Sequence, residues 1–400
     1  MLDDASIRRS QLCNKVPEVT IFFWIIKVLC TTVGETAADF LNVNLNFGLT
    51  GTSIVTGILL AVALIVQFKT VRYVAVVYWL AVVLISIFGT LLTDNLTDVV
   101  GFPLEQSTAL FSALLLITFA IWYRQERTLS IHSIFTVRRE AFYWLAVLFT
   151  FALGTAAGDL MAEALGLGYA TTGILVALIV AIFAVAWRLG LNSILAFWVI
   201  YIMTRPLGAS LGDYLTQSRA HGALGLGATT TTTIFSLAIF GTVLYLALTE
   251  SDVARENVAA EKRNRPLIFA QVVVVAFLFA AASIGGYLWQ SHRLLAERQV
   301  ATDTNGDALP LGDLSSFHEM TQATFDSINA GDWSGANDHA NEIEYAWDQA
   351  ESRLKPMNTE AWANLDDAID EVLREIRAIR PDQIGARSAL QKLQSKIANP

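Results

Sequence analysis

The stretch from Trp144 to Asp159, WLAVLFTFALGTAAGD, places an acidic residue at the end of an otherwise apolar run. Its frame, a tryptophan followed ten residues later by glycine and five residues after that by aspartate, occurs four times in the chain. The members are Trp24, Gly34 and Asp39; Trp79, Gly89 and Asp94; Trp144, Gly154 and Asp159; and Trp198, Gly208 and Asp213. Four occurrences without a change of spacing indicate an internal repeat, which any prediction of the fold must explain.

The composition indicates that this repeat is built for a membrane. Hydrophobic residues make up 54% of the chain and charged residues only 16%. Several apolar runs reach about 20 residues, the length that crosses roughly 30 Å of hydrocarbon as a helix. Candidate runs lie at residues 18–39, 48–68, 73–94, 106–123, 141–160, 170–188, 193–214, 225–248 and 267–289. We therefore predict an all-α fold, in which nine spans form a polytopic membrane helical bundle.

Each repeat contains two of the predicted spans, the first with the motif and the second without it. Two spans return the chain to the side on which it started, so the four repeats are parallel and their aspartates share one depth. The predicted organisation is a tail at 1–16, repeats at 17–70, 71–137, 138–190 and 191–250, a loop at 251–265, a ninth span at 266–290, a linker at 291–311, and a soluble helical bundle at 312–400.

Positively charged residues are concentrated on one side of the predicted membrane domain. The connections on that side hold Arg8, Arg9, Lys15, Lys69, Arg72, Arg124, Arg127, Arg138, Arg139, Arg188, Arg255, Lys262, Arg263 and Arg265. The short connections on the other side hold essentially only Arg219. Because Lys and Arg are enriched in cytoplasmic loops, we predict a multi-pass membrane protein with a cytoplasmic N-terminus and an extracytoplasmic C-terminal domain. In the inner membrane of a bacterium with two membranes, that domain lies in the periplasm.

The net charge of −9 lies entirely in the C-terminal quarter of the chain. Residues 291–400 contain 10 Lys and Arg against 19 Asp and Glu, which leaves 17 of each for residues 1–290. Apolar residues at helical spacing, such as Leu365, Ile369 and Val372, predict an antiparallel bundle of up to four helices. His339 and Glu342 have the spacing of metal ligands, but a solvated acidic surface is the simpler interpretation. Nothing in the chain is basic enough to predict nucleic-acid binding.

The motif aspartates are the main candidates for a functional site. Carboxylates that face lipid are costly, so these four are expected to face the bundle interior or water, although they could instead be interfacial residues that end helices. A second acid lies four residues from three of them; these acids are Glu35, Asp98 and Glu163. That spacing puts each pair on one helical face if the helix continues so far. Arg205, a lone arginine within a predicted span, is expected to pair with an acid of another repeat.

Other features of the spans have structural interpretations. The motif glycines allow close approach of helices, and the tryptophans either anchor at the cytoplasmic interface or pack inside. Lys27, near the inner end of the first span, is expected to extend to the cytoplasmic interface. Hydroxyl-rich segments at the starts of the even-numbered spans, such as 50–53 and 229–233, are expected to line a polar vestibule beside the aspartates.

The four tryptophan–glycine–aspartate units resemble a family of bacterial membrane proteins that are built from a tandem two-helix repeat of unknown function and are usually labelled uncharacterised membrane-anchored proteins. The resemblance covers about residues 15–250. It implies the architecture of the membrane domain and carries no established activity.

Two functional classes fit the pattern. In the first, the protein is a transporter whose acids converge on a polar cavity and hold a hard divalent cation such as manganese or magnesium, and protonation of a buried carboxylate could couple transport to a proton gradient. In the second, it is a membrane-anchored sensor or partner-binding protein that acts through the extracytoplasmic bundle. No phosphate-binding glycine loop, zinc-protease motif or Ser/His/Asp set occurs, so neither an enzyme activity nor a cofactor is predicted. The predicted partners are the lipid bilayer and a small cation.

Overall fold

The computed structural model describes residues 14–41, 48–216, 224, 226–253, 270–275, 277, 310–355, 357–378 and 380–398. Every regular element within these ranges is a helix, in agreement with the predicted fold class. Most of the predicted tail, ninth span and linker lies outside the described residues, although residues 270–275 are described and helical.

Eight of the helices are long and apolar enough to cross a membrane, which identifies the chain as a membrane protein. They are α2 (Ile21–Asp39), α3 (Gly48–Lys69), α4 (Ala75–Asp94), α5 (Leu104–Glu126), α6 (Val137–Asp159), α7 (Tyr169–Arg188), α8 (Ser193–Thr216) and α9 (Ala228–Thr249). Thr20 and Thr136 cap the N-termini of α2 and α6 through their hydroxyls, and Pro103 precedes α5, where its missing N–H is not needed.

The four motif helices form an inner ring, and the other four surround it. Helix α2 contacts α4, α4 contacts α6, α6 contacts α8, and α8 contacts α2 again. In the most apolar stretch of these helices 56–61% of the residues are buried, against 11–28% in α3, α5, α7 and α9. Each outer helix packs on the inner helix of the next repeat, and α9 returns to α2. The four repeats therefore close into a ring with approximate fourfold symmetry.

The motif glycines are the closest contact points of the inner ring. A Cβ atom added to any of them would collide with a side chain of the neighbouring inner helix. The four collisions are Gly34 with Ser86, Gly89 with Phe151, Gly154 with Arg205, and Gly208 with Thr31. Each partner lies three residues before the glycine of the neighbouring repeat. The repeated glycine thus sets the spacing of the ring, as the small-residue pattern predicts.

The aromatic pairs of the motif form a layer at the end of the ring opposite the aspartates. Rings of neighbouring repeats touch all the way round: Phe23 with Trp79 at 5.5 Å, Tyr78 with Trp144 at 5.4 Å, Tyr143 with Trp198 at 6.3 Å, and Phe197 with Trp24 at 5.7 Å between centroids. Trp79, Trp144 and Trp198 are at most 4% exposed. Of the two roles that the sequence allowed for the tryptophans, the structure shows packing.

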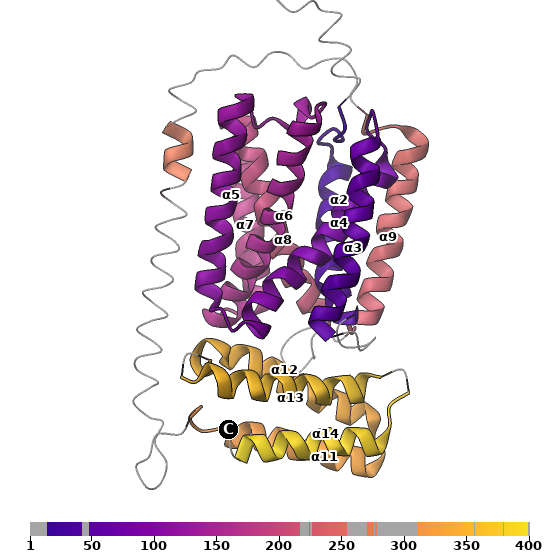
Figure 1. The fold of residues 1–400 in the computed structure, drawn as a ribbon, viewed down its shortest axis with the longest axis vertical. Helices are drawn as coiled ribbons and strands as arrows, with labels where there is room; N and C mark the ends of the chain where they lie inside the picture. The colour runs from indigo at the N-terminus through magenta and orange to yellow at the C-terminus, as the bar shows by residue number, and fades with distance from the viewer. Residues whose placement is uncertain are drawn as a thin grey trace, which may run out of the picture.

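The C-terminal residues form a separate four-helix bundle that lies across the aspartate end of the ring (Figure 1). Its helices are α11 (Ser315–Ala330), α12 (Trp333–Leu354), α13 (Thr359–Arg377) and α14 (Gln383–Ala398). Trp347 and Trp362 stack in its core with ring centroids 5.6 Å apart. Helices α12 and α13 face the membrane domain, and α12 packs against the turn that follows α6.

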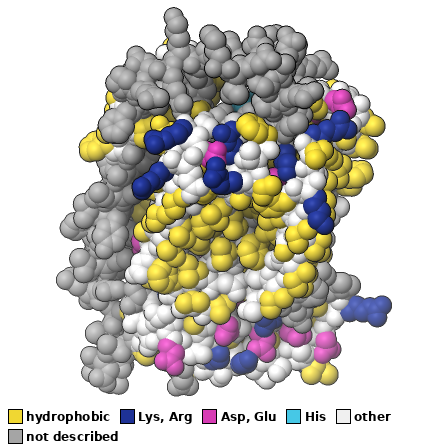
Figure 2. All heavy atoms as spheres, turned by 45° about the horizontal axis from the view of Figure 1, so that its top comes forward, with side chains coloured by type: hydrophobic (Ala, Val, Ile, Leu, Met, Phe, Trp, Pro, Cys, Tyr) yellow, Lys and Arg dark blue, Asp and Glu magenta, His cyan; other side chains and the backbone are white. Residues whose placement is uncertain are grey.

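The surface of the membrane domain carries a broad apolar band (Figure 2). Large exposed side chains such as Ile58, Val62 and Ile65 of α3 and Leu178 and Ile182 of α7 contribute to this outer surface. Lys and Arg side chains gather along the edge of the band that lies away from the bundle (Figure 2). The positive edge and the acidic bundle therefore lie at opposite ends of the molecule.

Candidate functional site

All four motif aspartates line one cavity between the ring and the C-terminal bundle. The cavity has a volume of about 190 Å³. The membrane domain contributes Glu35, Ala38, Asp39, Leu49, Asp94, Thr97, Asp98, Leu104, Asp159, Tyr169 and Asp213 to its lining, and the bundle contributes Glu344, Trp347, Asp348, Trp362, Asp366, Ile369, Asp370 and Leu373. Ten of these nineteen residues are acidic, and among the residues described there is no Lys, Arg or His in the lining.

The aspartates are half-buried and act on one another electrostatically. The carboxylates of Glu35, Asp159 and Asp39 repel the Asp94 carboxylate electrostatically, and the same three carboxylates repel that of Asp213. Within the described part of the chain, the side chains of Asp39, Asp94 and Asp213 form no hydrogen bond and no ion pair closer than 4.0 Å. Buried carboxylates without a partner are expensive, so these groups require a proton, a cation or water.

The inner helices change their winding immediately after the aspartates of the second and third repeats. Helix α4 ends at Asp94 and continues as a π-helical turn, η2 (Asn95–Val99), and α6 ends at Asp159 and continues as η4 (Leu160–Ala164). Residues 40–41 after Asp39 have the same winding. Such turns are rare and are frequent at functional sites. The sequence analysis missed them, because its spacing argument assumed that an α-helix continues.

The second acids of the repeats have different surroundings. Asp98 lies in η2 and lines the cavity. Glu35 also lines the cavity; it lies one helical turn before Asp39 in α2, farther from the bundle. Glu163 belongs to η4, but its side chain lies outside the described part of the structure, so its predicted pairing with Asp159 stays a prediction.

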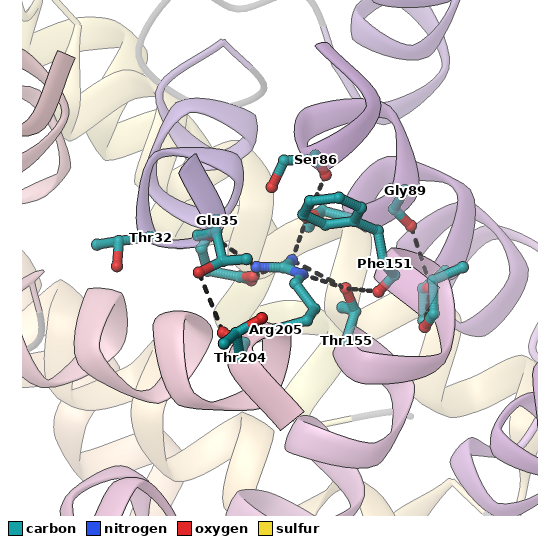
Figure 3. Close-up of polar contacts among 12 residues, drawn as sticks. Thr32, Glu35, Ser86, Gly89, Phe151, Thr155, Thr204 and Arg205 are labelled. Atoms are coloured by element: carbon teal, nitrogen blue, oxygen red, sulfur yellow. Dashed lines mark hydrogen bonds and ion pairs between the residues drawn. The ribbon is translucent and has the colours of Figure 1, made fainter. Parts of the chain in front are cut away.

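Arg205 connects all four repeats on the side of the cavity that faces away from the bundle, and Figure 3 shows its polar contacts. Its guanidinium is fully buried and donates to the Glu35 carboxylate at 2.5 Å, to the Thr155 hydroxyl at 2.8 Å, to the Thr90 hydroxyl and to the Thr31 carbonyl at 2.8 Å. Glu35, Thr90 and Thr155 are the residues that directly follow the motif glycines of the first three repeats. The arginine of the fourth repeat therefore bonds to one equivalent position in each of the other three. The expected pairing with an acid of another repeat is present.

The prediction that Lys27 extends to the cytoplasmic interface is wrong. Its side chain is 1% exposed and turns into the ring, where Nζ lies 3.7 Å from the centre of the Phe151 ring and 4.4 Å from that of Tyr201. Lys27 shares a face of α2 with Glu35, two turns away, and that face points inward. One turn toward the other end, the same face carries the buried Phe23, so the aromatic layer blocks the route to the interface.

The C-terminal bundle supplies two cations at the rim of the cavity. Lys355 is 4% exposed; its ammonium donates to the Thr97 carbonyl at 2.7 Å and lies 3.8 Å from the Asp98 carboxylate. Arg377 forms a two-pronged ion pair with Glu344 at 2.5 and 3.1 Å. Burial would lower the pKa of Arg377, but the Glu344 carboxylate holds it above its ordinary value. The sequence analysis named neither residue, because nothing in the bundle's helical pattern indicates which face docks on the ring.

The hydroxyl-rich segments mostly do not line the cavity, contrary to the prediction. Thr52, Ser107, Thr172 and Thr231 lie in the first turns of the outer helices, are fully buried, and have hydroxyls without a hydrogen-bond partner in the described structure. These side chains pack between helices because the outer helices contact the inner ring. Thr229 and Thr230 are the exceptions, since they line a second hollow of about 330 Å³ that shares Asp39 and Glu344 with the acidic cavity.

No preformed metal centre is present in the part of the chain that the structure describes. No three His, Cys, Asp or Glu side chains in it are placed to hold one ion together. His339 contacts Glu342 at 3.3 Å on the bundle surface, where the two side chains are 37% and 34% exposed. The acids of the cavity are spread over its wall and are not gathered at one point.

Comparison with known protein families matches the membrane domain to a repeat. Residues 22–73, 77–128, 142–190 and 196–252 each match the family described as Repeat of Unknown Function (DUF347). No curated protein and no solved structure matches the chain. The four matched segments coincide with the four pairs of inner and outer helices and together cover more than half of the sequence. The chain belongs to this family of tandem membrane repeats.

Proposed function

We propose that the protein is an integral membrane transporter that moves a small cation, with a divalent metal ion such as magnesium or manganese as its substrate. The observation that carries the proposal is the convergence of four repeat-related aspartates on one acidic cavity at the end of a closed ring. A structural role as helix-ending interfacial residues would not require the four to share a cavity.

The charge of the cavity supports a cation as the substrate. Ten carboxyl groups line it, and the nearby cations are already engaged: Arg205 with Glu35, Lys355 with Thr97 and Asp98, and Arg377 with Glu344. Asp39, Asp94 and Asp213 have no such partner among the described residues. A mobile cation would offset their mutual repulsion in a medium of low dielectric constant.

The spread of the acids favours a cation that keeps part of its water. Magnesium gives up its hydration shell reluctantly and is often held through one or two carboxylates and several waters, and carboxylates also suit manganese. A ring of separated carboxylates around a hydrated ion requires no group of three converging ligands, and none is present among the described residues.

The two ends of the ring suggest how access could alternate. The cavity lies on the bundle side of Arg205, and the layer of aromatic rings closes the opposite side. Passage of a cation would require the Arg205–Glu35 pair and the aromatic layer to separate in turn. In this proposal the positive edge of the apolar band faces the cytoplasm of a bacterial cell, and the bundle faces the periplasm.

One observation favours the alternative, a membrane-anchored sensor. The bundle is docked on the cavity through Lys355, whose ammonium reaches the Thr97 carbonyl in the ring. A cation that entered between the bundle and the ring could release this contact and change which bundle surface is available to a partner. A protein that binds the cation at the aspartates without moving it would support this alternative.

The test uses the full-length protein in sealed lipid vesicles with manganese as the probe. Asp39→Asn, Asp94→Asn, Asp159→Asn and Asp213→Asn are compared one at a time for manganese uptake, with trapped calcein as the reporter. Each change removes one negative charge from the cavity, so uptake at low manganese should fall by about tenfold, which corresponds to about 1.4 kcal/mol of binding. The matched control is Glu105→Gln. Glu105 lies in the first turn of α5, at the same end of the membrane domain as the four aspartates, but it does not line the cavity.

The outcomes separate the two functions. Uptake by all four variants at the wild-type rate would show that the cavity does not carry the cation. Manganese binding to the wild-type protein in detergent without uptake into vesicles would exclude transport of this ion and favour the sensor.

A further inference from the structure

Lys27 occupies a repeat position that does not require a charge. The residue three positions after the motif tryptophan is Lys27, Val82, Val147 or Tyr201 in the four repeats. All four side chains are at most 1% exposed and lie in the inner ring. Because valine fills the position twice, the packing of the ring does not explain the ammonium of the first repeat.

The surroundings of the ammonium are unusual for a lysine. Its Nζ has no hydrogen-bond partner in the described structure, and it lies over the faces of the Phe151 and Tyr201 rings. The titratable or charged groups that act on it are Cys30 of its own helix and Arg205 and Tyr201 of α8; no carboxylate is among them. Cation–π contacts offset only part of the cost of removing an ammonium from water.

A row of phenolic hydroxyls leads from Lys27 toward the end opposite the bundle. Tyr143 acts electrostatically on Tyr201, whose buried hydroxyl has no hydrogen-bond partner among the described residues. The Tyr143 and Tyr78 hydroxyls are hydrogen-bonded at 2.5 Å. The Tyr78 ring packs edge-on against Tyr73 at 5.6 Å, and the Tyr73 hydroxyl donates to Asp252 at 2.5 Å. Asp252 follows α9, is 1% exposed, and leaves its second carboxylate oxygen without a partner among the described residues.

In the other direction, one face of α2 leads from Lys27 to the acidic cavity. Thr31 lies one turn away and its carbonyl accepts from Arg205, which is paired with Glu35 one turn further on. Glu35 lines the cavity. Eight residues of helix separate Lys27 from Glu35, a distance of about 12 Å along the axis. Lys27 therefore lies between a row of hydroxyls and the site of the cation.

We propose that Lys27 is the group that binds and releases a proton when the cavity empties and fills, so that cation movement in one direction is coupled to proton movement in the other. This inference rests on the proposed transport function. When a cation enters the cavity, an N–H bond of the Lys27 ammonium breaks, the amine keeps the electron pair, and the proton passes along the tyrosine hydroxyls to the Asp252 carboxylate. When the cation leaves the cavity on the bundle side, Lys27 takes up a proton from the emptied cavity along the α2 face past Glu35, so a proton crosses the ring in the direction opposite to the cation. No oxidation or reduction is involved.

The distance allows this coupling to have a useful size. Two unit charges about 12 Å apart in a partly polar interior change each other's binding by about tenfold. Burial raises the pKa of Asp252, although the hydrogen bond from Tyr73 acts against this, so the carboxyl group at the far end of the row can hold a proton more readily than an exposed aspartate. The row thus ends in a group able to accept the released proton.

The experiment measures manganese and proton movement separately in vesicles that contain the full-length protein. Calcein reports manganese entry, and pyranine in parallel vesicles reports the internal pH. Lys27→Met and Lys27→Arg are compared with wild type, since methionine has no proton to exchange and arginine does not release its proton in proteins. We expect the manganese-driven pH change to fall about tenfold or more in both variants. Manganese binding in detergent should be about tenfold tighter in Lys27→Met than in Lys27→Arg, because only the arginine keeps its positive charge about 12 Å from the bound cation. Lys69→Met, at the exposed end of α3, is the matched control and should behave as wild type.

Each outcome decides between the coupling and the transport proposals. A wild-type pH response in both Lys27 variants, or manganese entry into wild-type vesicles without any pH change, would overturn the role of Lys27 and leave transport in place. Absence of manganese binding and entry in the wild-type protein would overturn both. If neither Lys27 variant folds, Tyr143→Phe decides in the same assay, because Phe23 and Phe197 fill the equivalent positions of the first and fourth repeats and show that the ring accepts phenylalanine there.

Discussion

The second and third repeats differ from the first and fourth in what they place at equivalent interior positions. Three residues after the tryptophan the four repeats carry Lys27, Val82, Val147 and Tyr201, and three residues before the glycine they carry Thr31, Ser86, Phe151 and Arg205. All eight side chains are at most 1% exposed. The second and third repeats show that the ring can be built from neutral side chains, whereas the first and fourth add a buried base, an acid and an arginine.

The difference teaches that architecture and chemistry are distributed unequally over the repeats. The glycines, tryptophans and aspartates are common to all four and set the helix spacing, the aromatic layer and the cavity. The charges of Lys27, Glu35 and Arg205 belong to α2 and α8, which are neighbours because the ring closes between the first and the last repeat. The ion pair between Arg205 of the fourth repeat and Glu35 of the first therefore joins the last repeat to the first. The third repeat carries its buried charge elsewhere, at Glu140 near the start of α6, where it pairs with Lys15 at 2.6 Å.

The largest expected effect breaks this charge pair. Arg205→Met removes the bonds to Thr31, Thr90 and Thr155 and leaves Glu35 without its partner at 2.5 Å. Removing one partner of a buried pair costs about 3–5 kcal/mol, so the free energy of unfolding should fall by that amount. The measurement is unfolding of the purified protein in detergent, followed by tryptophan fluorescence.

Two further variants show whether the loss comes from the stranded acid. Adding Glu35→Gln to Arg205→Met should restore part of the stability, and a double variant no more stable than the single one would contradict this explanation. Arg138→Met removes an ion pair whose arginine is 64% exposed, and it should cost less than about 1 kcal/mol.

A smaller effect is expected at a position that all repeats share. Gly208→Ala introduces a Cβ that would collide with Thr31 and the Thr32 backbone across the closure of the ring. Overpacking of this kind costs about 1–3 kcal/mol. Gly241→Ala in α9 is the control, because a Cβ there meets nothing within 4 Å and alanine favours the helix. Equal thermal stabilities of the two variants would show that the glycines do not set the spacing of the ring.

Much of this fold could be predicted because the same spacing recurs four times. One apolar run identifies a span. Four tryptophan–aspartate spacings identical to that between Trp24 and Asp39 also imply that the aspartates share one depth and that the repeats are parallel. The convergence on Arg205 was expected only in outline. Its partners Thr90 and Thr155 can be recognised from sequence by aligning the repeats on glycine, since both occupy the position of Glu35.

Other features could not be predicted, for identifiable physical reasons. The inward turn of Lys27 depends on which face of α2 meets the ring, and a short apolar helix has too weak a periodicity to show it. The π-helical turns after Asp94 and Asp159 depend on contacts with α5, α7 and the bundle. The docking of Lys355 on Thr97 joins residues more than 250 positions apart, and neither η2 nor the end of α12 carries a local pattern that encodes it.

The smallest predicted effect concerns an acid outside the repeats. It tests whether a cavity-lining carboxylate of the C-terminal bundle lowers the stability of the protein when it is ionised. Burial raises the pKa of Asp370 in α13 to about 6, with Arg374 acting in the opposite direction. The pKa of an aspartate in the unfolded chain is about 4. Below that pH Asp370 is protonated in both states and does not change the free energy of unfolding. As the pH rises through about 6, the free energy of unfolding falls, because the folded protein must ionise a buried carboxyl group. Asp370→Asn should therefore stabilise the protein at pH 8 by about 1 kcal/mol, after allowance for partial exposure, and should have no effect near pH 4.

Thermal unfolding at the two pH values measures this difference, with Asp338→Asn on the exposed side of α12 as the control. A stabilisation by Asp370→Asn of equal size at both pH values would mean that ionisation of Asp370 is not the cause. A stabilisation confined to high pH would show that the ionised, buried Asp370 carboxylate destabilises the bundle. In that case a cation that enters the cavity should stabilise the docked bundle as well as the ring, and manganese should reduce the difference between Asp370→Asn and wild type at pH 8.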